Sequence, residues 1–274
     1  MSTVALIKTL CEEFYVDFSD VEALAELGNY KAQIILGIVR AEQGDLGKAI
    51  SLCRKGLAAA AQKYDKKTLE VSMGLIKVVS EEGVSSLQEL YYYLMLDLAS
   101  VVGISPYEGI AEWAEPLAQR GSTPCQRIIG ELYAYGKGVR RDYQKALEYL
   151  RMAAGDGDSI AQYELGRIFL EGEGVKADND KAFLYLSLSA SNGNADAEAL
   201  IGLLLFKHER YEEAAKFLLR AAKKGIAEAQ NALGLMFEVG LGVEENMVEA
   251  VRWLRKAAEN GHDDAKKELA KLGR

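Results

Sequence analysis

The chain repeats itself at a fixed interval, and this repetition constrains its fold more than any other feature. The segment Cys125–Ile160 recurs 36 residues later as Ala161–Asp196, and a further copy runs from Ala229 to Asp264. A period of this length is typical of solenoids, in which one repeat cannot bury its apolar face without the next. Each of these copies carries a Gly-x-Gly-Val element: Gly136–Val139, Gly172–Val175 and Gly240–Val243.

Two other copies are shorter. The interval from Gly202 to Ala214 is 12 residues, against 16 from Gly166 to Ala182, so this copy lacks the four residues of the Gly-x-Gly-Val turn. Gly37 and Ala49 are also 12 residues apart. The repetition therefore begins near the N-terminus.

Each copy predicts two antiparallel helices, because its apolar and small residues recur at steps of three and four. A glycine recurs where the two helices would cross, which lets the backbones approach closely. Another glycine follows each second helix, where a helix C-terminus favours positive φ. We therefore expect an all-α fold, a right-handed superhelical solenoid of stacked helix-turn-helix repeats. The crossing glycines are Gly37, Gly130, Gly166, Gly202 and Gly234, and the terminal ones are Gly28, Gly121, Gly157, Gly193, Gly225 and Gly261.

The shared pattern is A-x-x-x-L-G-x-x-[YF]-x-x-G-x-G-V-x-x-[DN]-x-x-x-A-x-x-[YW]-L-x-x-[AS]-A-x-x-G, which resembles the Sel-one-like repeat family, relatives of the tetratricopeptide repeat. The resemblance covers Cys125 to Asp264 closely and Val21 to Ala60 more weakly. Asp142, Asp178 and Asn246 occupy one position of the pattern, where each is suited to cap the second helix. Family members typically act as adaptors that assemble protein complexes, so the resemblance implies binding rather than catalysis.

The expected organisation is one continuous solenoid. Residues 1–60 would hold an N-terminal cap helix and a short tetratricopeptide-like repeat, residues 123–264 four Sel-one-like repeats, and residues 265–274 a C-terminal cap helix. Residues 61–122 fit either a degenerate repeat or a helical insertion. Three helices are expected near that region: Lys66–Glu82, Ser86–Val102 and Pro106–Arg120.

Charge and cysteine content limit the possible partners and location. The chain holds 33 Lys and Arg against 41 Asp and Glu, and its net charge of -8 opposes the phosphate neutralisation on which nucleic-acid binding depends. No stretch reaches transmembrane length, and Met1–Phe18 lacks the features of a signal peptide. We expect no nucleic-acid or membrane partner. Cys11, Cys53 and Cys125 have no metal-binding or redox spacing, so buried reduced thiols and a cytoplasmic location are expected.

The residues that could carry catalysis or metal binding form no convincing set. The Gly-x-Gly elements join two helices and lack a Gly-Lys-Ser/Thr ending, which favours a structural turn over a phosphate site. His208 and His262 lie in different copies without a second ligand at zinc spacing. A hydrolase hidden within 62–122 is the least favoured hypothesis, because no nucleophile–base pair is visible there. We expect no catalytic residues, no metal and no cofactor.

The predicted binding surface is the face that the first helices turn away from the core, because solenoid curvature gathers such faces into a concave groove. Counted from the crossing glycine, positions -3, +1 and +4 should point inward. The apolar residues at these positions could instead pack against neighbouring first helices, an alternative that carries equal weight. The predicted partner-binding residues are Arg127, Glu131, Tyr163, Arg167, Leu170, Leu203, Phe206, Asn231, Leu235 and Glu238, with Ala134 and Ala199 beside them.

Three successive tyrosines, Tyr91, Tyr92 and Tyr93, form a second candidate for partner contact. Three adjacent helical residues cannot all face one core, so at least one should be exposed.

Two functions fit these features. The leading hypothesis is a non-catalytic scaffold or adaptor that grips a peptide or helix of another protein in its concave groove. The alternative is a dedicated inhibitor or immunity protein that blocks an enzyme's active site, a role for which an acidic, rigid surface is suited.

Overall fold

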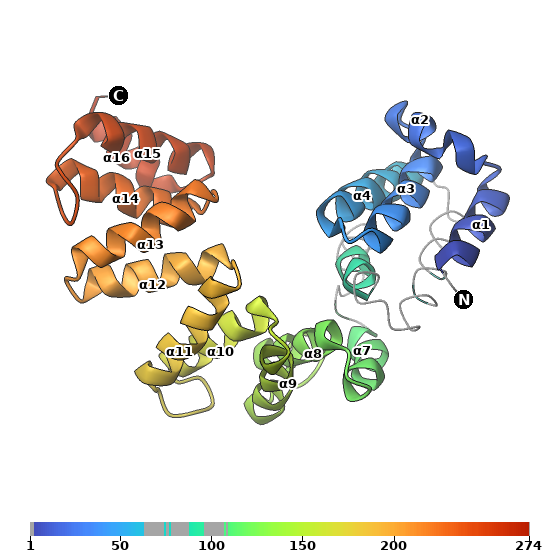
Figure 1. Cartoon of the computed structure of the whole chain (residues 1–274), viewed down its shortest axis with the longest axis horizontal. Helices are drawn as coiled ribbons and strands as arrows, with labels where there is room; N and C mark the ends of the chain where they lie inside the picture. The colour runs from blue at the N-terminus through green and yellow to red at the C-terminus, as the bar shows by residue number, and fades with distance from the viewer. Residues whose placement is uncertain are drawn as a thin grey trace. The chain divides into compact units, whose positions relative to one another are not determined.

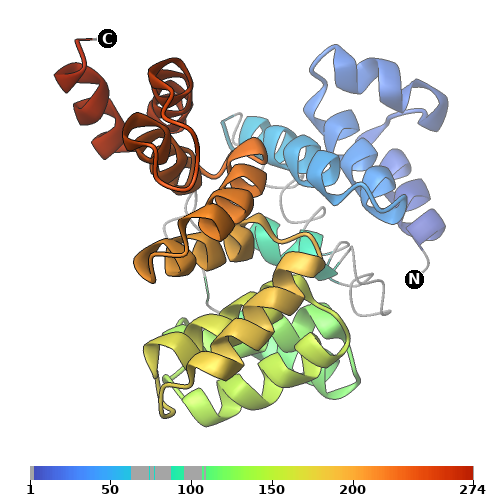
Figure 2. The same ribbon diagram turned by 60° about the vertical axis from the view of Figure 1, so that its left-hand side comes forward.

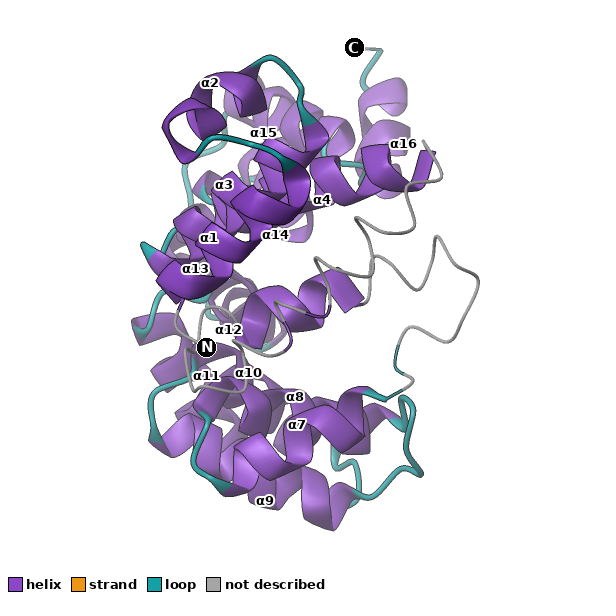
Figure 3. Ribbon diagram, turned by 90° about the vertical axis from the view of Figure 1, so that its right-hand side faces the viewer, coloured by secondary structure: helices purple, strands orange, loops and turns teal. Residues whose placement is uncertain are grey.

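The computed structural model describes residues 3–62, 74, 77, 88–95, 107 and 109–273. Every regular element in these ranges is helical, and the ribbon of the described residues in Figure 3 contains no strand. The predicted all-α class is confirmed. The chain divides into two compact units, Met1–Tyr149 and Leu150–Arg274, which we describe one after the other (Figure 1).

Unit 1 begins with α1 (Thr3–Phe14), the 3-10 helix η1 (Phe18–Asp20), α2 (Val21–Glu26), α3 (Tyr30–Glu42) and α4 (Leu46–Gln62). Helix α3 packs along α4, and both α1 and α2 contact α3. Leu10 and Phe14 of α1 are buried, so α1 covers apolar surface of this group.

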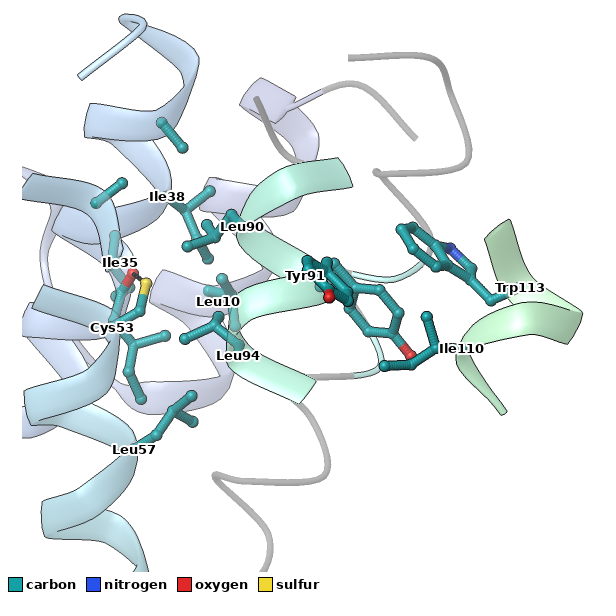
Figure 4. Packing of buried hydrophobic residues seen from close by; sticks show 14 of the residues in the cluster. Leu10, Ile35, Ile38, Cys53, Leu57, Leu90, Tyr91, Leu94, Ile110 and Trp113 are labelled. Atoms are coloured by element: carbon teal, nitrogen blue, oxygen red, sulfur yellow. Dashed lines mark hydrogen bonds between the residues drawn. The ribbon is translucent and has the colours of Figure 1, made fainter. Parts of the chain in front are cut away.

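The core of unit 1 continues into a helix that spans 88–95 (Figure 4). Its residues Leu90 and Leu94 face Leu10 and Ile38, while Tyr91 points the other way, toward Trp113. The ring centroids of Tyr91 and Trp113 are 4.7 Å apart. This helix is therefore packed on two sides.

The expectation that one of the three tyrosines would be exposed is wrong. Tyr91 and Tyr92 are buried and Tyr93 is half-buried, because their helix lies between two sets of core side chains. The expected helix Pro106–Arg120 corresponds to α7 (Ile110–Gln119), which packs against α8 (Thr123–Tyr135). Apart from residues 74, 77 and 88–95, the expected helices Lys66–Glu82 and Ser86–Val102 lie outside the described residues.

Helix α9 (Tyr143–Gly155) contains the boundary between the units. Unit 2 then holds helix pairs in series, coloured yellow to dark red in Figure 2. Each first helix packs on the following second helix, each second helix packs on the next first helix, and α16 packs on α15. These helices are α10 (Ser159–Glu171), α11 (Asn179–Ser191), α12 (Ala195–Lys207), α13 (Tyr211–Lys223), α14 (Ala227–Val239), α15 (Met247–Glu259) and α16 (Asp263–Lys271).

The crossing glycines hold each pair of unit 2 together. A Cβ atom added at Gly166 would lie 2.6 Å from Cγ of Leu186, and one added at Gly202 would lie 2.7 Å from Cγ of Leu218. These distances leave no room for a methyl group, and both leucines are fully buried. Gly234 meets Leu254 in the same way.

The sequence-based assignment of the helix ends is also confirmed. Asp178 accepts a hydrogen bond from the backbone N–H of Lys181 at 3.0 Å, and Asn246 accepts from that of Glu249 at 3.1 Å. Gly193 and Gly225 have φ of +88° and +98°, values that residues with a side chain rarely adopt.

A glutamine that is buried, or half-buried in the case of Gln33, ties successive helix pairs together, a role that the sequence did not reveal. It lies four residues before the crossing glycine, and its Nε2 donates to a carbonyl in the last turn of the preceding helix, which also accepts the backbone N–H three residues on. In unit 2, Asn192 completes the contact by donating to Oε1 of Gln162 at 2.9 Å. The four pairs are Gln33 with Ala25, Gln126 with Ala118, Gln162 with Ala154 and Gln230 with Ala222, at 3.0–3.3 Å.

The short repeat of unit 2 replaces this amide pair with an ion pair. Glu198 occupies the glutamine position and is buried, and Lys224 occupies the position of Asn192. Nζ of Lys224 lies 2.8 Å from the Glu198 carboxylate, and Nε of Arg220 lies 3.1 Å from it. Two chemically different pairs therefore serve the same junction.

The crossing glycine gives a first test of the packing. Gly202→Ala should lower the free energy of unfolding by about 1–3 kcal/mol, because the added methyl overlaps Leu218. Gly155→Ala is the control, since nothing lies near its added Cβ and alanine favours helix, so its free energy of unfolding should stay level or rise by less than about 1 kcal/mol. Urea denaturation followed by circular dichroism measures both, and equal stability of the two variants would contradict the close crossing.

The ion pair of the short repeat gives a second test. Lys224→Ala should lower the free energy of unfolding by about 1–3 kcal/mol, because it leaves the buried Glu198 carboxylate short of a partner. The double variant Glu198→Gln, Lys224→Asn restores the amide pair of the other repeats and should recover most of that loss. If thermal denaturation finds the double variant no more stable than Lys224→Ala, the two pairs are not equivalent.

Candidate partner-binding surface

The two predicted binding residues of unit 1 form an ion pair that is largely enclosed. Arg127 is only 1% exposed, and its Nη1 lies 3.0 Å from the carboxylate of Glu131, which is half-buried. Glu89, from the helix 88–95, lies 3.6 Å from Arg127 on the other side. The predicted exposure of Arg127 is therefore wrong, because the helix 88–95 packs beside α8, and the sequence had not resolved the register of that region.

The other eight predicted residues lie in unit 2, on three first helices. Helix α10 carries Tyr163, Arg167 and Leu170, helix α12 carries Leu203 and Phe206, and helix α14 carries Asn231, Leu235 and Glu238. Helix α12 contacts α14 directly. Leu235 is 37% exposed and the other seven are half-buried, so this face of the helices is partly covered by its neighbours and partly open.

The apolar residues of this face are partly packed into the core and partly accessible at the surface. Leu203 and Phe206 pack against the buried cluster that contains Leu186 and Leu218, yet both keep part of their side chains accessible. The ring of Phe206 meets that of Tyr211 edge-on at 5.2 Å between centroids, which fixes its orientation. These side chains thus make the core packing that one interpretation expected, while the partner contact expected by the other stays a prediction.

The polar residues of this face are ion-paired or have buried polar atoms. Nη2 of Arg167 lies 3.2 Å from Glu171, one helical turn along α10. Burial raises the pKa of Tyr163, so its hydroxyl remains protonated at neutral pH. Oδ1 of Asn231 is buried and accepts no hydrogen bond within the described part of the chain.

A cavity of about 360 Å³ opens beside Leu170, and sequence reasoning missed most of its lining. Phe183, on the second helix α11, is one of its walls and is 48% exposed. The four residues missing from the short repeat were the one sequence signal that could have found it. The cavity is lined by Leu170, Asn179, Ala182, Phe183, Leu204, Leu205, His208 and Arg210.

Cys53 and His262 are held in structural positions rather than in a reactive site. Burial raises the pKa of the Cys53 thiol to about 12, which leaves it a poor nucleophile. Nδ1 of His262 accepts from the backbone N–H of Ala265 at 3.4 Å and caps α16. Among the described residues, no three His, Cys, Asp or Glu side chains gather closely enough to hold a metal ion. None of the described helices has the length and apolar character to span a membrane.

Comparison with known proteins identifies the repeat type. The Sel1 repeat family matches residues 123–158, 159–194, 201–226 and 227–262. Residues 195–200 lie between the second and third matches, and α12 begins among them.

Curated relatives share the repeats over part of their length. The mouse (Mus musculus) DAP3-binding cell death enhancer 1 is 31% identical over 201 residues, which cover 70% of this chain and 39% of the relative. Chitin synthase regulatory factor 3 of Schizosaccharomyces pombe is 45% identical over 58 residues, or 21% of this chain and 6% of the relative. The chain thus spans about two fifths of the mouse relative and far less of the yeast one.

Among solved structures, the fold resembles that of a Sel1 repeat protein from Oxalobacter formigenes. The two chains superpose with a TM-score of 0.64 at 25% identity, over 92% of this chain and 78% of the other.

Proposed function

Because this chain belongs to the Sel1-repeat family, through the four repeats between residues 123 and 262, we propose that it is a non-catalytic protein-binding scaffold. The observation that supports this function best is the row of accessible apolar side chains on successive first helices of unit 2. Leu203 and Phe206 of α12 and Leu235 of α14 lie on helices that touch each other. A row of this kind suits the apolar face of a peptide or helix.

The expected ligand is a segment of another protein, recognised by apolar contacts at the centre and polar contacts at the edge. Arg167 and Glu238 would supply the polar contacts. Apolar anchors surrounded by a polar rim are the usual anatomy of a protein interface. In unit 1, Arg127 would act by holding Glu131 in place, since its own side chain is enclosed.

Two further observations are in keeping with this role. The mouse relative carries the name of a DAP3-binding protein. Cys11, Cys53 and Cys125 are free thiols, which fits the reducing, cytoplasmic setting that we propose. A scaffold or adaptor needs no cofactor and no metal for binding.

An inhibitor or immunity role is the second candidate, and the net charge of -8 is the observation that favours it. An acidic surface steers a basic partner and can cover an enzyme's active site. Purification of the bound partner separates the two roles, because an inhibitor would form a one-to-one complex that abolishes its partner's enzymatic activity.

The double variant Leu203→Ala, Phe206→Ala should reduce partner capture by at least about tenfold, because truncation of two apolar anchors removes more than about 1.4 kcal/mol of binding free energy. Quantitative mass spectrometry of proteins retained on the immobilised chain from a cell lysate gives the measurement. Circular dichroism must show unchanged helix content.

The matched control is Met247→Ala, Val248→Ala, which removes two exposed apolar side chains from the second helix α15. This control variant should capture the partner as well as the unmodified chain does. Undiminished capture by the Leu203, Phe206 double variant would refute a binding site on the first-helix face.

A further inference from the structure

The connection between the two helices of a repeat is short in only one repeat of unit 2. Seven residues, 240–246, join α14 to α15, whereas three residues, 208–210, join α12 to α13. The difference is the Gly-x-Gly-Val turn. The cavity beside Leu170 lies at this short connection, because His208 and Arg210 line it.

Where the turn is present, it lies on the preceding repeat. A Cβ atom added at Gly242 would overlap the backbone of Tyr211, the first residue of α13, so the turn and the start of this second helix are in direct contact. Val243, next to Gly242, packs against the buried cluster of unit 2. In unit 1, Gly138 lies against the backbone of Tyr107 in the same manner.

The start of α11 is the equivalent place that no such turn covers. Asn179 is the first residue of α11, as Tyr211 is of α13, and it lines the cavity with Ala182 and Phe183. The repeat that follows α11 is the short one, so the cavity lies where this repeat lacks the turn. A cavity of about 640 Å³ also lies between α13 and the turn 240–244, so the presence of a turn does not by itself remove the cavity. What distinguishes α11 is that no glycine-containing turn with an aliphatic side chain covers its start.

Helix α11 also differs from its counterparts on its outer face, which is an independent sign of a covering partner. Leu184 and Leu188 are 55% and 43% exposed, beside Phe183. The helices α13 and α15 carry cations at the same two positions, Lys216 and Arg220 on α13 and Arg252 and Lys256 on α15. A contiguous exposed apolar patch on one helix, where its counterparts are charged, marks an interaction site.

The cavity does not supply a free cation for a partner's carboxylate. No carboxylate is among the residues that line it, and Arg210 already donates two hydrogen bonds to Glu213, at 2.8 Å and 2.6 Å. The aliphatic side chain is therefore the part of a covering turn that the cavity would recognise.

We propose that the cavity and the apolar face of α11 bind a turn of another protein, one that presents an aliphatic side chain after a glycine and so takes the place of the missing Gly-x-Gly-Val turn. This inference builds on the proposed protein-binding function and adds a second contact, distinct from the Leu203 and Phe206 face. Phe183, Leu170 and Leu205 would enclose the aliphatic side chain.

The probe is a synthetic peptide with the sequence Gly-Leu-Gly-Val-Glu-Glu-Asn, that of residues 240–246. It is titrated into the full chain carrying ¹³C-labelled leucine methyl groups and followed by NMR. The methyl signals of Leu170, Leu204 and Leu205 should shift and saturate at roughly millimolar peptide or below, while those of Leu269 in α16 should not move. A peptide in which aspartate replaces the valine should bind at least about tenfold more weakly.

Two variants test the location without disturbing the fold. Phe183→Ala introduces the residue that α13 carries at the same position, Ala215, and should weaken peptide binding about tenfold with helix content unchanged. In the graft variant, residues 240–246 replace residues 208–210, which restores the missing turn. This graft should cover the start of α11, exclude the peptide and abolish the methyl shifts.

Absence of saturable shifts, or shifts that persist in the graft variant, would overturn the proposal. Concentration-dependent dimerisation that Leu184→Lys removes would also overturn it, since the occupant would then be a second copy of this chain. If capture of a partner depends on Leu203 and Phe206 but not on Phe183, the proposed function stands and this inference fails.

Discussion

The close crossing of the two helices in each repeat is the constraint on which the rest of unit 2 depends. Gly166, Gly202 and Gly234 each place the backbone of a first helix directly over a buried leucine of the following second helix. Because an added side chain would overlap that leucine, any residue other than glycine destabilises the crossing. This contact sets the distance between the paired helices, and that distance sets which side chains of the pair are enclosed and which remain accessible.

Successive pairs are joined by polar groups as well as by apolar packing. The side chain of Gln162 donates to the Ala154 carbonyl at the end of one helix and accepts from Asn192 at the end of another. Such a network satisfies the buried side-chain amide of Gln162, which would otherwise lack partners. In the short repeat, Glu198 and Lys224 replace the amides at the same place, so the geometry of the junction is maintained while its chemistry changes.

The short repeat is also where the functional proposals meet. It presents Leu203 and Phe206 on its first helix, and its abbreviated connection leaves the start of α11 uncovered. A cavity lies at this uncovered start, and the apolar outer face of α11 adjoins it. A departure from the repeat pattern is informative here because the other repeats show what the regular structure would have placed there.

The sequence by itself determined the helical class, the pairing of helices, the crossing glycines and the caps at Asp178 and Asn246, because these features depend on local spacing and on steric limits that recur in every repeat. Only the tertiary structure decided the burial of Arg127 and of Tyr91, since both result from the helix 88–95, which follows no repeat pattern and packs against elements distant in sequence. The cavity at Phe183 likewise required coordinates, because it is formed by side chains of two repeats and by a turn that one of them lacks. A periodic sequence specifies the contacts that every repeat makes. The accessible surface depends instead on which neighbouring side chains cover each residue, and those neighbours differ from repeat to repeat.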